Sequence, residues 1–456
     1  MCQVNTSRLP QYVAALIASL ATVSSGTTIG WTGNTIDLLL AGEYNDIPIS
    51  LTNLGWLTSL PSLASIISAF PIGMMCDKYG RKTTLIISTI ITLLGWVIIL
   101  FANSIEMLLI GRFVDGLGSG SNFFLVPIYI CEIAEKEIRG KLSSFIPLFF
   151  GIGVFLSYVL GYVATLTTLT VVCTAIPGVF LIGILFQTES PVYIAKQKRY
   201  DEAKKILTYL RGKSNDVQAE INEIMSGLEL ENNESFLKNF LKKRSAKIAT
   251  IVTFFLFFLQ VACGTIAIVF YTSYIFETSG AALNNKLTTI VFGAIQLIAA
   301  FTSSHVIEVF RRRVLLLTSC IFSAIGLLTI GTFLSLKDRG LVSDEILSSI
   351  SFMPILGLCV FSLAVSVGIM PIPSILAAEL YPPEIKGVGV SAAGIFNSFL
   401  VFLISRFYPN LKVAVGGDVT FYIFTAVCWL GVVFTFLVVP ETKGKPLEQI
   451  QYELNK

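Results

Sequence analysis

The stretch that decides the fold is DKYGRK at residues 77–82, which stands between two long apolar runs. In it Asp77 precedes Arg81 by four residues, and Glu308 and Arg312 repeat that spacing 231 residues later (308 − 77 = 231). Charged side chains are costly inside hydrocarbon, so pairs of this kind are expected where apolar helices leave a membrane. The repeat indicates that one pattern of helices occurs twice.

Two further acidic patterns repeat at the ends of apolar runs. Glu132 precedes Arg139 by seven residues, and Glu379 precedes Lys386 by the same distance. The two glutamates are 247 residues apart (379 − 132 = 247). The sixth and twelfth apolar runs each end at a glutamate, 252 residues apart (441 − 189 = 252), namely Glu189 and Glu441. These offsets predict a parallel duplication of six spans, an architecture typical of transporters whose two bundles rock about a central site.

The composition excludes most soluble classes of protein. Hydrophobic residues make up 54% of the 456 residues and charged residues 13%, whereas a soluble domain carries about 25% charged residues. A net charge of +3 is too small and scattered to predict a nucleic-acid partner. Eight cysteines without paired spacing and a single histidine, His305, indicate neither a disulfide framework nor a metal site. We expect a membrane protein that needs no cofactor and is not an enzyme.

Apolar runs long enough to cross a bilayer follow one another along the whole chain. Backbone polar groups in hydrocarbon must be satisfied within the segment, so each run is expected to be a helix. The runs are 12–32, 53–75, 84–102, 107–131, 142–163, 168–187, 248–276, 286–308, 314–336, 350–378, 388–411 and 419–439. The expected fold is all-α, with twelve transmembrane helices in two six-helix bundles, 1–187 and 248–439.

Lysine and arginine give the expected orientation. If both termini and the segment 188–247 face the cytosol, 26 of the 32 basic residues lie on that side (32 − 6 = 26). The six others are Arg112, Lys286, Lys337, Arg339, Arg406 and Lys412. Because basic residues concentrate on the cytosolic side of membrane proteins, both termini are predicted to be cytosolic.

The long polar segment 188–247 is predicted to be a cytosolic linker between the bundles. Apolar positions recur at helical spacing over residues 200–210, which favours short amphipathic helices beneath the membrane. The alternative is a merely solvated linker. Residues 440–456 are expected to form a cytosolic tail.

The repeated acids and bases have an expected role as latches at the cytosolic ends of the bundles. Ion pairs there would stabilise one conformational state and break when that side opens. The candidate latch residues are Asp77, Arg81, Glu132, Arg139, Glu189, Glu308, Arg312, Glu379, Lys386 and Glu441. The alternative is that these residues only flank helices.

These motifs occur in an order that is known from one family. They stand at 77–82, at Gly111 and Arg112, and at 127–140, 189–191, 379–387 and 440–448. In them the chain resembles the sugar porters of the major facilitator superfamily, over almost its whole length. Its short N-terminus and Gly30-Trp31 are most similar to the insect facilitated trehalose and hexose carriers. The resemblance implies sugar transport by alternating access.

The chain departs from the family pattern in the predicted seventh span. There the family's second glutamine and its asparagine are replaced by apolar residues. A separate departure lies after the fourth span, where Glu135 stands in place of the usual proline. The amides that remain in the spans are Gln260, Gln296 and Asn397, which are our expected substrate contacts. Buried amides need partners, so hydrogen bonds to neighbouring helices are the alternative.

Two aromatic residues complete the expected substrate site. Tyr271 and Trp31 lie in apolar runs where their rings can stack on a sugar, although packing is the commoner role of such residues. Proton-driven relatives resemble one another in a first-span aspartate, and this chain has Thr32 there. Arg112 and Asp115, at i,i+3 on a helix, are expected to form a structural pair, with a proton relay as the alternative.

The expected function is facilitative transport of a sugar, trehalose or a hexose, across the plasma membrane. The departures in the seventh span leave two alternatives, a sugar sensor that does not transport and a carrier of a polyol or other small metabolite. The expected partners are the sugar and the lipid bilayer. The sequence gives no oligomeric state.

Overall fold

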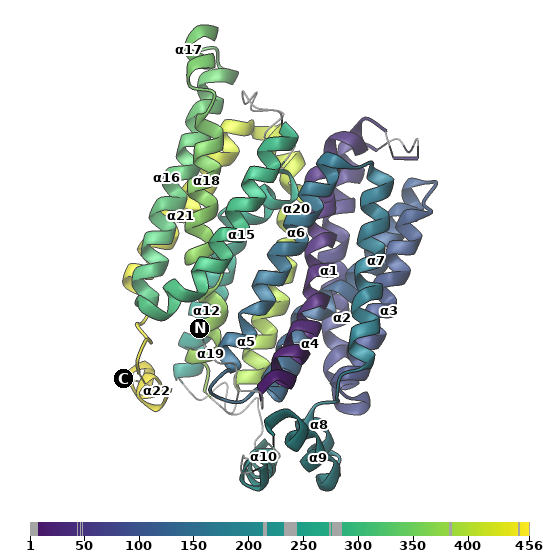
Figure 1. Ribbon diagram of the computed structural model, residues 1–456. Coiled ribbons are helices and arrows are strands. Elements are labelled where there is room, and N and C mark those ends of the chain that lie inside the picture. Colours follow the sequence, from purple (N-terminus) through teal and green to yellow (C-terminus); the bar gives the residue numbers. More distant parts are fainter. Residues whose placement is uncertain are drawn as a thin grey trace. The chain divides into compact units, whose positions relative to one another are not determined.

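The computed structural model describes residues 8–42, 44–45, 47, 49–212, 217–231, 244–272, 275, 285–382, 385–445 and 447–455. Within them the chain is helical and has no strand (Figure 1). The helices of the first half are α1 (Leu9–Leu40), α2 (Leu51–Tyr79), α3 (Arg81–Leu100), α4 (Ile105–Ile133), α5 (Arg139–Ser143), α6 (Phe145–Val163) and α7 (Leu166–Leu185). They confirm that the first six predicted spans are helical.

The second half repeats the pattern with two broken spans. Its helices are α12 (Arg244–Ala262), α13 (Thr265–Phe270), α15 (Asn285–Val309), α16 (Arg312–Asp338), α17 (Asp344–Ser349), α18 (Met353–Val367), α19 (Ile372–Leu380), α20 (Lys386–Val415), α21 (Gly417–Leu437) and α22 (Leu447–Asn455). The predicted seventh span is α12 with α13, and the tenth is α18 with α19. Positions 273–274 and 276 of the predicted seventh span lie outside the described residues.

Eleven helices of the described residues are long and apolar enough to cross a membrane. The fourth predicted span forms α4, which is not among them. Its polar side chains face other helices, because Arg112 and Asp115 are fully buried and Asn122 is 2% exposed. The amide nitrogen of Asn122 donates to the carbonyl oxygen of Ala21 in α1 at 3.1 Å. Partners inside the protein therefore make this polar helix compatible with a membrane.

Glycines let α4 approach its neighbours closely. A Cβ built on Gly95 of α3 would lie 2.3 Å from the backbone nitrogen of Asp115. A Cβ on Gly116 would lie 2.3 Å from the Cα of Pro61 in α2. Small residues at such contacts are typical of membrane helices, whose association depends on close packing rather than on burial from water.

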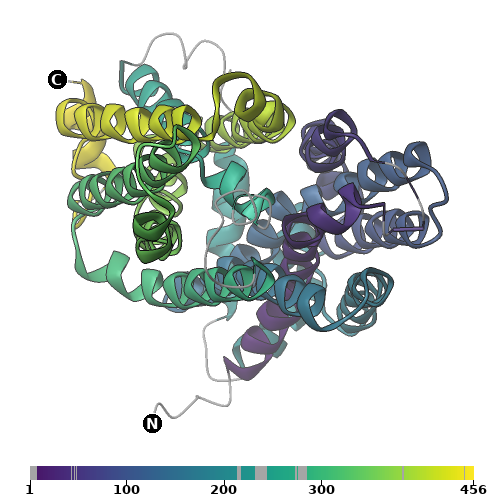
Figure 2. The same cartoon turned by 90° about the horizontal axis from the view of Figure 1, so that it is seen from above.

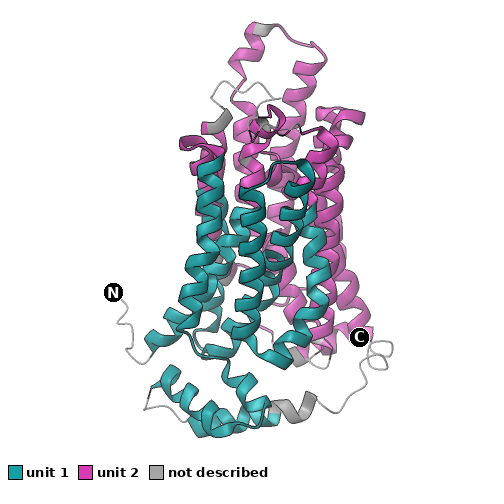
Figure 3. Cartoon of the chain, turned by 90° about the vertical axis from the view of Figure 1, so that its right-hand side faces the viewer, with its two compact units in different colours: residues 1–28, 60–156, 167–234 teal, residues 29–59, 157–166, 235–456 magenta. Residues whose placement is uncertain are grey.

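The contacts of the chain divide it into two compact units (Figure 3). Unit 1 contains residues 1–28, 60–156 and 167–234, and unit 2 contains 29–59, 157–166 and 235–456. Unit 2 thus includes parts of α1, α2 and α6 as well as the helices of the second half. Within it, Tyr158 of α6 donates its hydroxyl to the carbonyl of Val269 in α13 at 3.0 Å. The division into two six-helix bundles at 1–187 and 248–439 remains a prediction from the duplication.

In unit 2 the helix α16 packs against both α18 and α21, and Figure 2 shows these green and yellow helices from above. Gly326 of α16 and Gly357 of α18 face each other there, since a Cβ on either would lie within 2.7 Å of the other's carbonyl oxygen. Helix α16 also supports the break between α18 and α19. Ser319 of α16 donates its hydroxyl to the carbonyl of Ala364 at 2.6 Å and accepts from the backbone nitrogen of Ile369 at 3.1 Å.

The polar segment after α7 is helical where its pattern predicts helices. It forms α8 (Pro191–Lys196), α9 (Tyr200–Arg211) and α10 (Val217–Glu231). Ala203, Leu207 and Leu210 of α9 are fully buried, which is the apolar face expected from the spacing. Gly212, with φ of 79°, ends α9 in a conformation that favours glycine. The segment is therefore packed structure and not a solvated linker over α8–α10.

Candidate functional site

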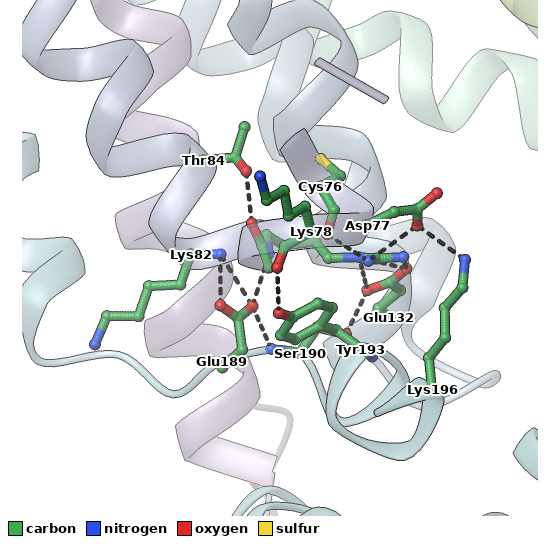
Figure 4. A network of polar contacts seen from close by, with 12 residues as sticks. Cys76, Asp77, Lys78, Lys82, Thr84, Glu132, Glu189, Ser190, Tyr193 and Lys196 are labelled. Carbon is green, nitrogen blue, oxygen red and sulfur yellow. Dashed lines mark hydrogen bonds and ion pairs between the residues drawn. The ribbon is translucent and has the colours of Figure 1, made fainter. Parts of the chain in front are cut away.

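Arg81 and Glu132 form a tight ion pair between the start of α3 and the end of α4 (Figure 4). The Nε of Arg81 donates to both carboxylate oxygens of Glu132, at 3.1 and 2.8 Å, and its Nη2 donates to Oε1 at 2.8 Å. The Nη1 donates to the carbonyl of Cys76 at 3.0 Å, and Asp77 lies 3.8 Å away. A guanidinium with this many partners is held in one orientation.

Glu189 caps α3 next to that ion pair (Figure 4). Its Oε1 accepts from the backbone nitrogens of Arg81 at 2.9 Å and Lys82 at 3.0 Å. A carboxylate at a helix N-terminus satisfies free N–H groups and stabilises the positive end of the helix dipole. Gly80, with φ of 92°, leaves the necessary room, because a Cβ there would lie 2.4 Å from Oε2 of Glu189. Ser190 then donates its hydroxyl to Glu132 and joins the cap to the ion pair.

The second half contains the corresponding arrangement within unit 2. Glu441 caps α16 by accepting from the backbone nitrogens of Arg312 at 3.1 Å and Arg313 at 3.2 Å. Thr442, in the place of Ser190, donates its hydroxyl to Glu379 at 2.5 Å. The Nη2 of Arg312 lies 3.7 Å from Oε1 of Glu379. The sequence repeat is therefore also a repeat of geometry.

The two copies differ in strength. The pair of Arg81 and Glu132 has side-chain exposures of 10% and 15% and short hydrogen bonds, whereas the pair of Arg312 and Glu379 has 16% and 27% and a separation of 3.7 Å. The turn before the second pair has Arg311 with φ of −69° where the first has Gly80. The second pair is the looser one, and so it is the easier to break.

The other predicted latch residues have different positions. Arg139 begins α5 and is exposed. The side chains of Glu308 and Lys386 lie outside the described residues. Among the predicted latch residues, Arg81 with Glu132 joins α3 to α4 and Arg312 with Glu379 joins α16 to α19, so each of these pairs lies within one half of the sequence. Asp77 also pairs with Lys196 of α8 at 2.9 Å. The latch role of the whole set stays a prediction.

A further cluster of charged residues was missed by the sequence analysis. Glu135 pairs with Arg8, whose Nε lies 2.8 Å from its Oε2, and exchanges two hydrogen bonds of 2.9 Å with the buried Gln11. Arg211 of α9, 2% exposed, donates to the carbonyl of Ile133 at 2.6 Å and is bidentate to Glu220 of α10. The cluster ties α9 and α10 to α1 and α4. Its one sequence signal was the acidic residue in place of proline at position 135.

Two of the three predicted amides lie together. The Nδ2 of Asn397 in α20 donates to Oε1 of Gln260 in α12 at 2.8 Å. The Nε2 of Gln260 donates to the carbonyl of Met370 at 2.7 Å, where the broken span runs from α18 to α19. Unwound backbone leaves carbonyls free to accept such bonds, and transporters use broken helices of this kind at their binding sites. Gln296, on α15, is half-buried and is not part of this amide pair.

The predicted aromatic contacts are buried in this conformation. Tyr271 is fully buried; its hydroxyl donates to the carbonyl of Ser405 at 2.7 Å and lies 2.8 Å from the hydroxyl of Thr58. Trp31 is fully buried and meets Tyr44 edge to face with ring centroids 6.0 Å apart. Both rings pack against protein here, and their contact with a substrate stays a prediction.

Arg112 and Asp115 form a fully buried pair within α4. The Nη1 of Arg112 lies 3.7 Å from Oδ2 of Asp115, and Thr28 of α1 donates its hydroxyl to Oδ1 of Asp115 at 3.2 Å. The pair therefore links α4 to α1. In the part of the chain that the structure describes, no group of three histidine, cysteine or acidic residues is placed to hold a metal ion.

Comparison with known proteins places these features in one family. The model of the family described as "Sugar (and other) transporter" matches residues 2–454. The facilitated trehalose transporter Tret1 of Culex quinquefasciatus is 30% identical over 97% of this chain and 86% of its own. The same transporter of Anopheles gambiae is also 30% identical, and the chain spans only 56% of its length. Sugar transporter ERD6-like 6 of Arabidopsis thaliana is 32% identical over 98% of this chain and 91% of its own.

The fold is also that of a solved structure. The inward open conformation of the xylose transporter XylE from E. coli superimposes with a TM-score of 0.79 over 97% of this chain and 98% of the other. The sequences are 20% identical, so this likeness shows the fold alone. It agrees with the predicted twelve-helix architecture.

The two ion pairs should differ in their effect on stability. We expect Glu132→Gln to destabilise the protein by about 3 kcal/mol, because it leaves the largely buried charge of Arg81 without its carboxylate. Glu379→Gln should cost about 1 kcal/mol or less, since the pair with Arg312 is longer and more exposed. Melting temperatures in detergent measure the difference, with Glu106→Gln on the exposed first turn of α4 as control. Equal melting temperatures for the two variants would contradict the assignment.

Proposed function

The chain belongs to the sugar transporter family, and from that premise we propose that it carries a sugar, trehalose or a hexose, across a membrane by alternating access. The single observation that carries the proposal is the family match over residues 2–454. The relatives named as facilitated trehalose transporters support trehalose as one candidate cargo. Transport is proposed to run down the sugar gradient without a coupled ion.

The polar groups of the second half suit a sugar. Gln260 and Asn397 offer amide donors and acceptors beside the free carbonyl of Met370 in a broken span. Sugar hydroxyls require such partners, because a buried hydroxyl without one costs about 1–3 kcal/mol. In the conformation described, Asn397 donates to Gln260, and Gln260 donates to Met370. A sugar would take over these hydrogen bonds.

The orientation and location are proposed from the charges. The basic residues of the sequence favour cytosolic termini, and the ion pairs of α3 with α4 and of α16 with α19 then lie at the cytosolic ends of their helices. We place the protein in the plasma membrane, with the two halves of the duplication as the moving bundles. The proposed latch consists of the ion pairs and caps around Arg81 and Arg312.

A second candidate is suggested by the altered seventh span. Val261 and Ile266 occupy the positions where the family has its second glutamine and its asparagine, and both are apolar. Fewer donors for sugar hydroxyls favour a smaller polyol as cargo, or a protein that senses sugar without moving it. Uptake of radiolabelled trehalose, glucose, fructose and polyols into liposomes separates these candidates from the first.

The amide pair should determine substrate affinity. We expect Gln260→Ala and Asn397→Ala each to weaken sugar binding by about two- to tenfold, which corresponds to the loss of one hydrogen bond of about 0.5–1.5 kcal/mol. Binding of radiolabelled sugar to the purified protein measures the effect. If both variants bind and transport as the unaltered protein does, the amides serve helix packing only.

The looser ion pair should affect transport more than binding. We expect Glu379→Gln to reduce the turnover of sugar while binding from one side remains largely intact, because the pair with Arg312 stabilises one conformational state. Exchange rates and binding constants in liposomes measure the two effects separately. Weaker binding with an unchanged turnover would place Glu379 at the substrate instead.

Transport should be passive and nearly independent of external pH. The first span has Thr32 rather than a carboxylate, and Asp115 is buried beside Arg112, which cannot lose its proton at neutral pH. We therefore expect equilibration of sugar without accumulation, unaffected by a protonophore. Accumulation above the outside concentration that a protonophore abolishes would contradict passive transport. If Asp115→Asn also removed that accumulation, Asp115 would be the proton carrier.

A further inference from the structure

Ser319 of α16 forms hydrogen bonds to the broken tenth span at two places. Its hydroxyl donates to the carbonyl of Ala364 in the last turn of α18 at 2.6 Å, and it accepts from the backbone nitrogen of Ile369 in the break at 3.1 Å. The side chain of Ser319 is 3% exposed, and Ile369 is fully buried. Because a hydroxyl can donate once and accept twice, one serine can serve both groups. Ser319 therefore joins a neighbouring helix to the break itself.

The backbone of the break explains why Ile369 needs this partner. In a continuous helix its N–H would donate to the carbonyl four residues earlier, that of Val365. The carbonyl of Val365 accepts from the backbone nitrogen of Met370 instead, at 2.9 Å. The N–H of Ile369 is thus displaced from the helical pattern, and a buried N–H without a partner is costly. The hydroxyl of Ser319 takes the place of the missing carbonyl.

A glycine lets the break lie directly against α16. A Cβ built on Gly368 would lie 2.5 Å from the Cβ of Ser319 and 2.6 Å from the carbonyl oxygen of Leu315, one turn earlier in α16. A residue with a Cβ therefore fits here only if one of the two backbones moves. The helix resumes just after this point, where the N–H of Ile372 donates to the carbonyl of Gly368 at 3.1 Å. The contacts of α16 with Gly368 and Ile369 fix the place where the span is interrupted.

The same break presents a carbonyl to the amide pair. The N–H that Ser319 holds and the carbonyl of Met370 belong to adjacent residues, so the position of one limits the position of the other. That carbonyl accepts from the Nε2 of Gln260 at 2.7 Å, and Gln260 accepts from Asn397 at 2.8 Å. Ser319 is thus connected through the break to the expected sugar contacts. All of these residues belong to unit 2.

A second serine of α16 shows that burial alone does not account for Ser319. Ser323 lies about one turn later in the same helix and is fully buried. Among the residues that the structure describes, its hydroxyl has no hydrogen-bond partner. The two serines share a helix and a buried environment, and they differ in what their hydroxyls contact. Ser323 is therefore the matched control for Ser319.

We propose that Ser319 is a positioning residue for sugar recognition, whose hydroxyl holds the break so that the carbonyl of Met370 stays aligned with Gln260. Ser319 does not touch the sugar and acts through Met370 and the amide pair. The proposal rests on the proposed transport function and adds to it a residue on α16 that determines the affinity of the site. Without the hydroxyl, the backbone of the break can shift, and a shifted carbonyl no longer orients Gln260.

Hydrogen exchange tests the contact in the absence of sugar. In the purified full-length protein, Ser319→Ala should speed the exchange of the backbone amide of Ile369 by about two- to tenfold, because one hydrogen bond is lost. Mass spectrometry of peptides that cover residues 366–372 measures the rate. Ser319→Cys, whose thiol is a weak donor and acceptor, should lie between Ser319→Ala and the parent. Ser323→Ala should exchange as the parent does.

Uptake kinetics test the role in sugar recognition. In liposomes with radiolabelled glucose and trehalose, Ser319→Ala should raise KM by about two- to tenfold and leave the maximal rate largely unchanged. Gly368→Ala, which keeps the hydroxyl but pushes the break away from α16, should also raise KM. In protein that already carries Gln260→Ala, Ser319→Ala should raise KM no further, because both changes act on the same hydrogen bond.

Three results would overturn the proposal: exchange in Ser319→Ala at the rate of the parent, an equal effect of Ser323→Ala, or effects of Ser319→Ala and Gln260→Ala on KM that simply add. Faster exchange with an unchanged KM would overturn it as well, since the hydroxyl would then serve the fold alone. If the parent moves neither sugar, the proposed function fails, and the exchange of Ile369 still decides whether Ser319 holds the break.

Discussion

The carboxylates of Glu189 and Glu441 each accept hydrogen bonds from the first backbone nitrogens of a helix, and much of this structure is organised around these two caps. Each cap fixes an arginine at the first position of that helix. The arginine then turns its side chain to a second carboxylate, Glu132 or Glu379. In this way four free N–H groups and two guanidinium groups at the ends of apolar helices find partners, without which charge at these places would be costly.

The cap and ion pair occur in both halves of the sequence, but the ion pair is tighter in the first half. The pair at Glu132 is bidentate and closed by Ser190, whereas the pair at Glu379 is 3.7 Å long and retains only the bond from Thr442. The firm copy holds α3, α4 and α8 together. In the proposed latch, the weak copy is the one that would separate, α16 from α19, at the smaller cost in free energy.

The broken spans leave backbone polar groups free to form hydrogen bonds within an otherwise apolar bundle. Gly264, with φ of 91°, separates α12 from α13, and the segment 368–371 separates α18 from α19. A continuous helix would use the carbonyl of Met370 itself, but the break leaves it for Gln260. Ser319 satisfies the backbone on the other side of the break. The result is a set of hydrogen-bonding groups that can exchange partners with a ligand, at a place where uninterrupted helices would offer none.

The sequence by itself located the apolar helical runs and the duplicated motifs at their ends, although not the breaks within the seventh and tenth runs. Apolar runs of bilayer length must be helical because no other local structure satisfies the backbone in hydrocarbon, and the spacing of Asp77 with Arg81 and of Glu132 with Arg139 is a local property that can be read twice. It also placed Gln260 and Asn397 in the spans. Only the tertiary structure decided which groups meet: that Asn397 bonds to Gln260, and that Glu135 joins Arg8 and Gln11. These contacts join residues more than 100 positions apart, and they depend on how helices pack, which periodicity within one helix does not specify.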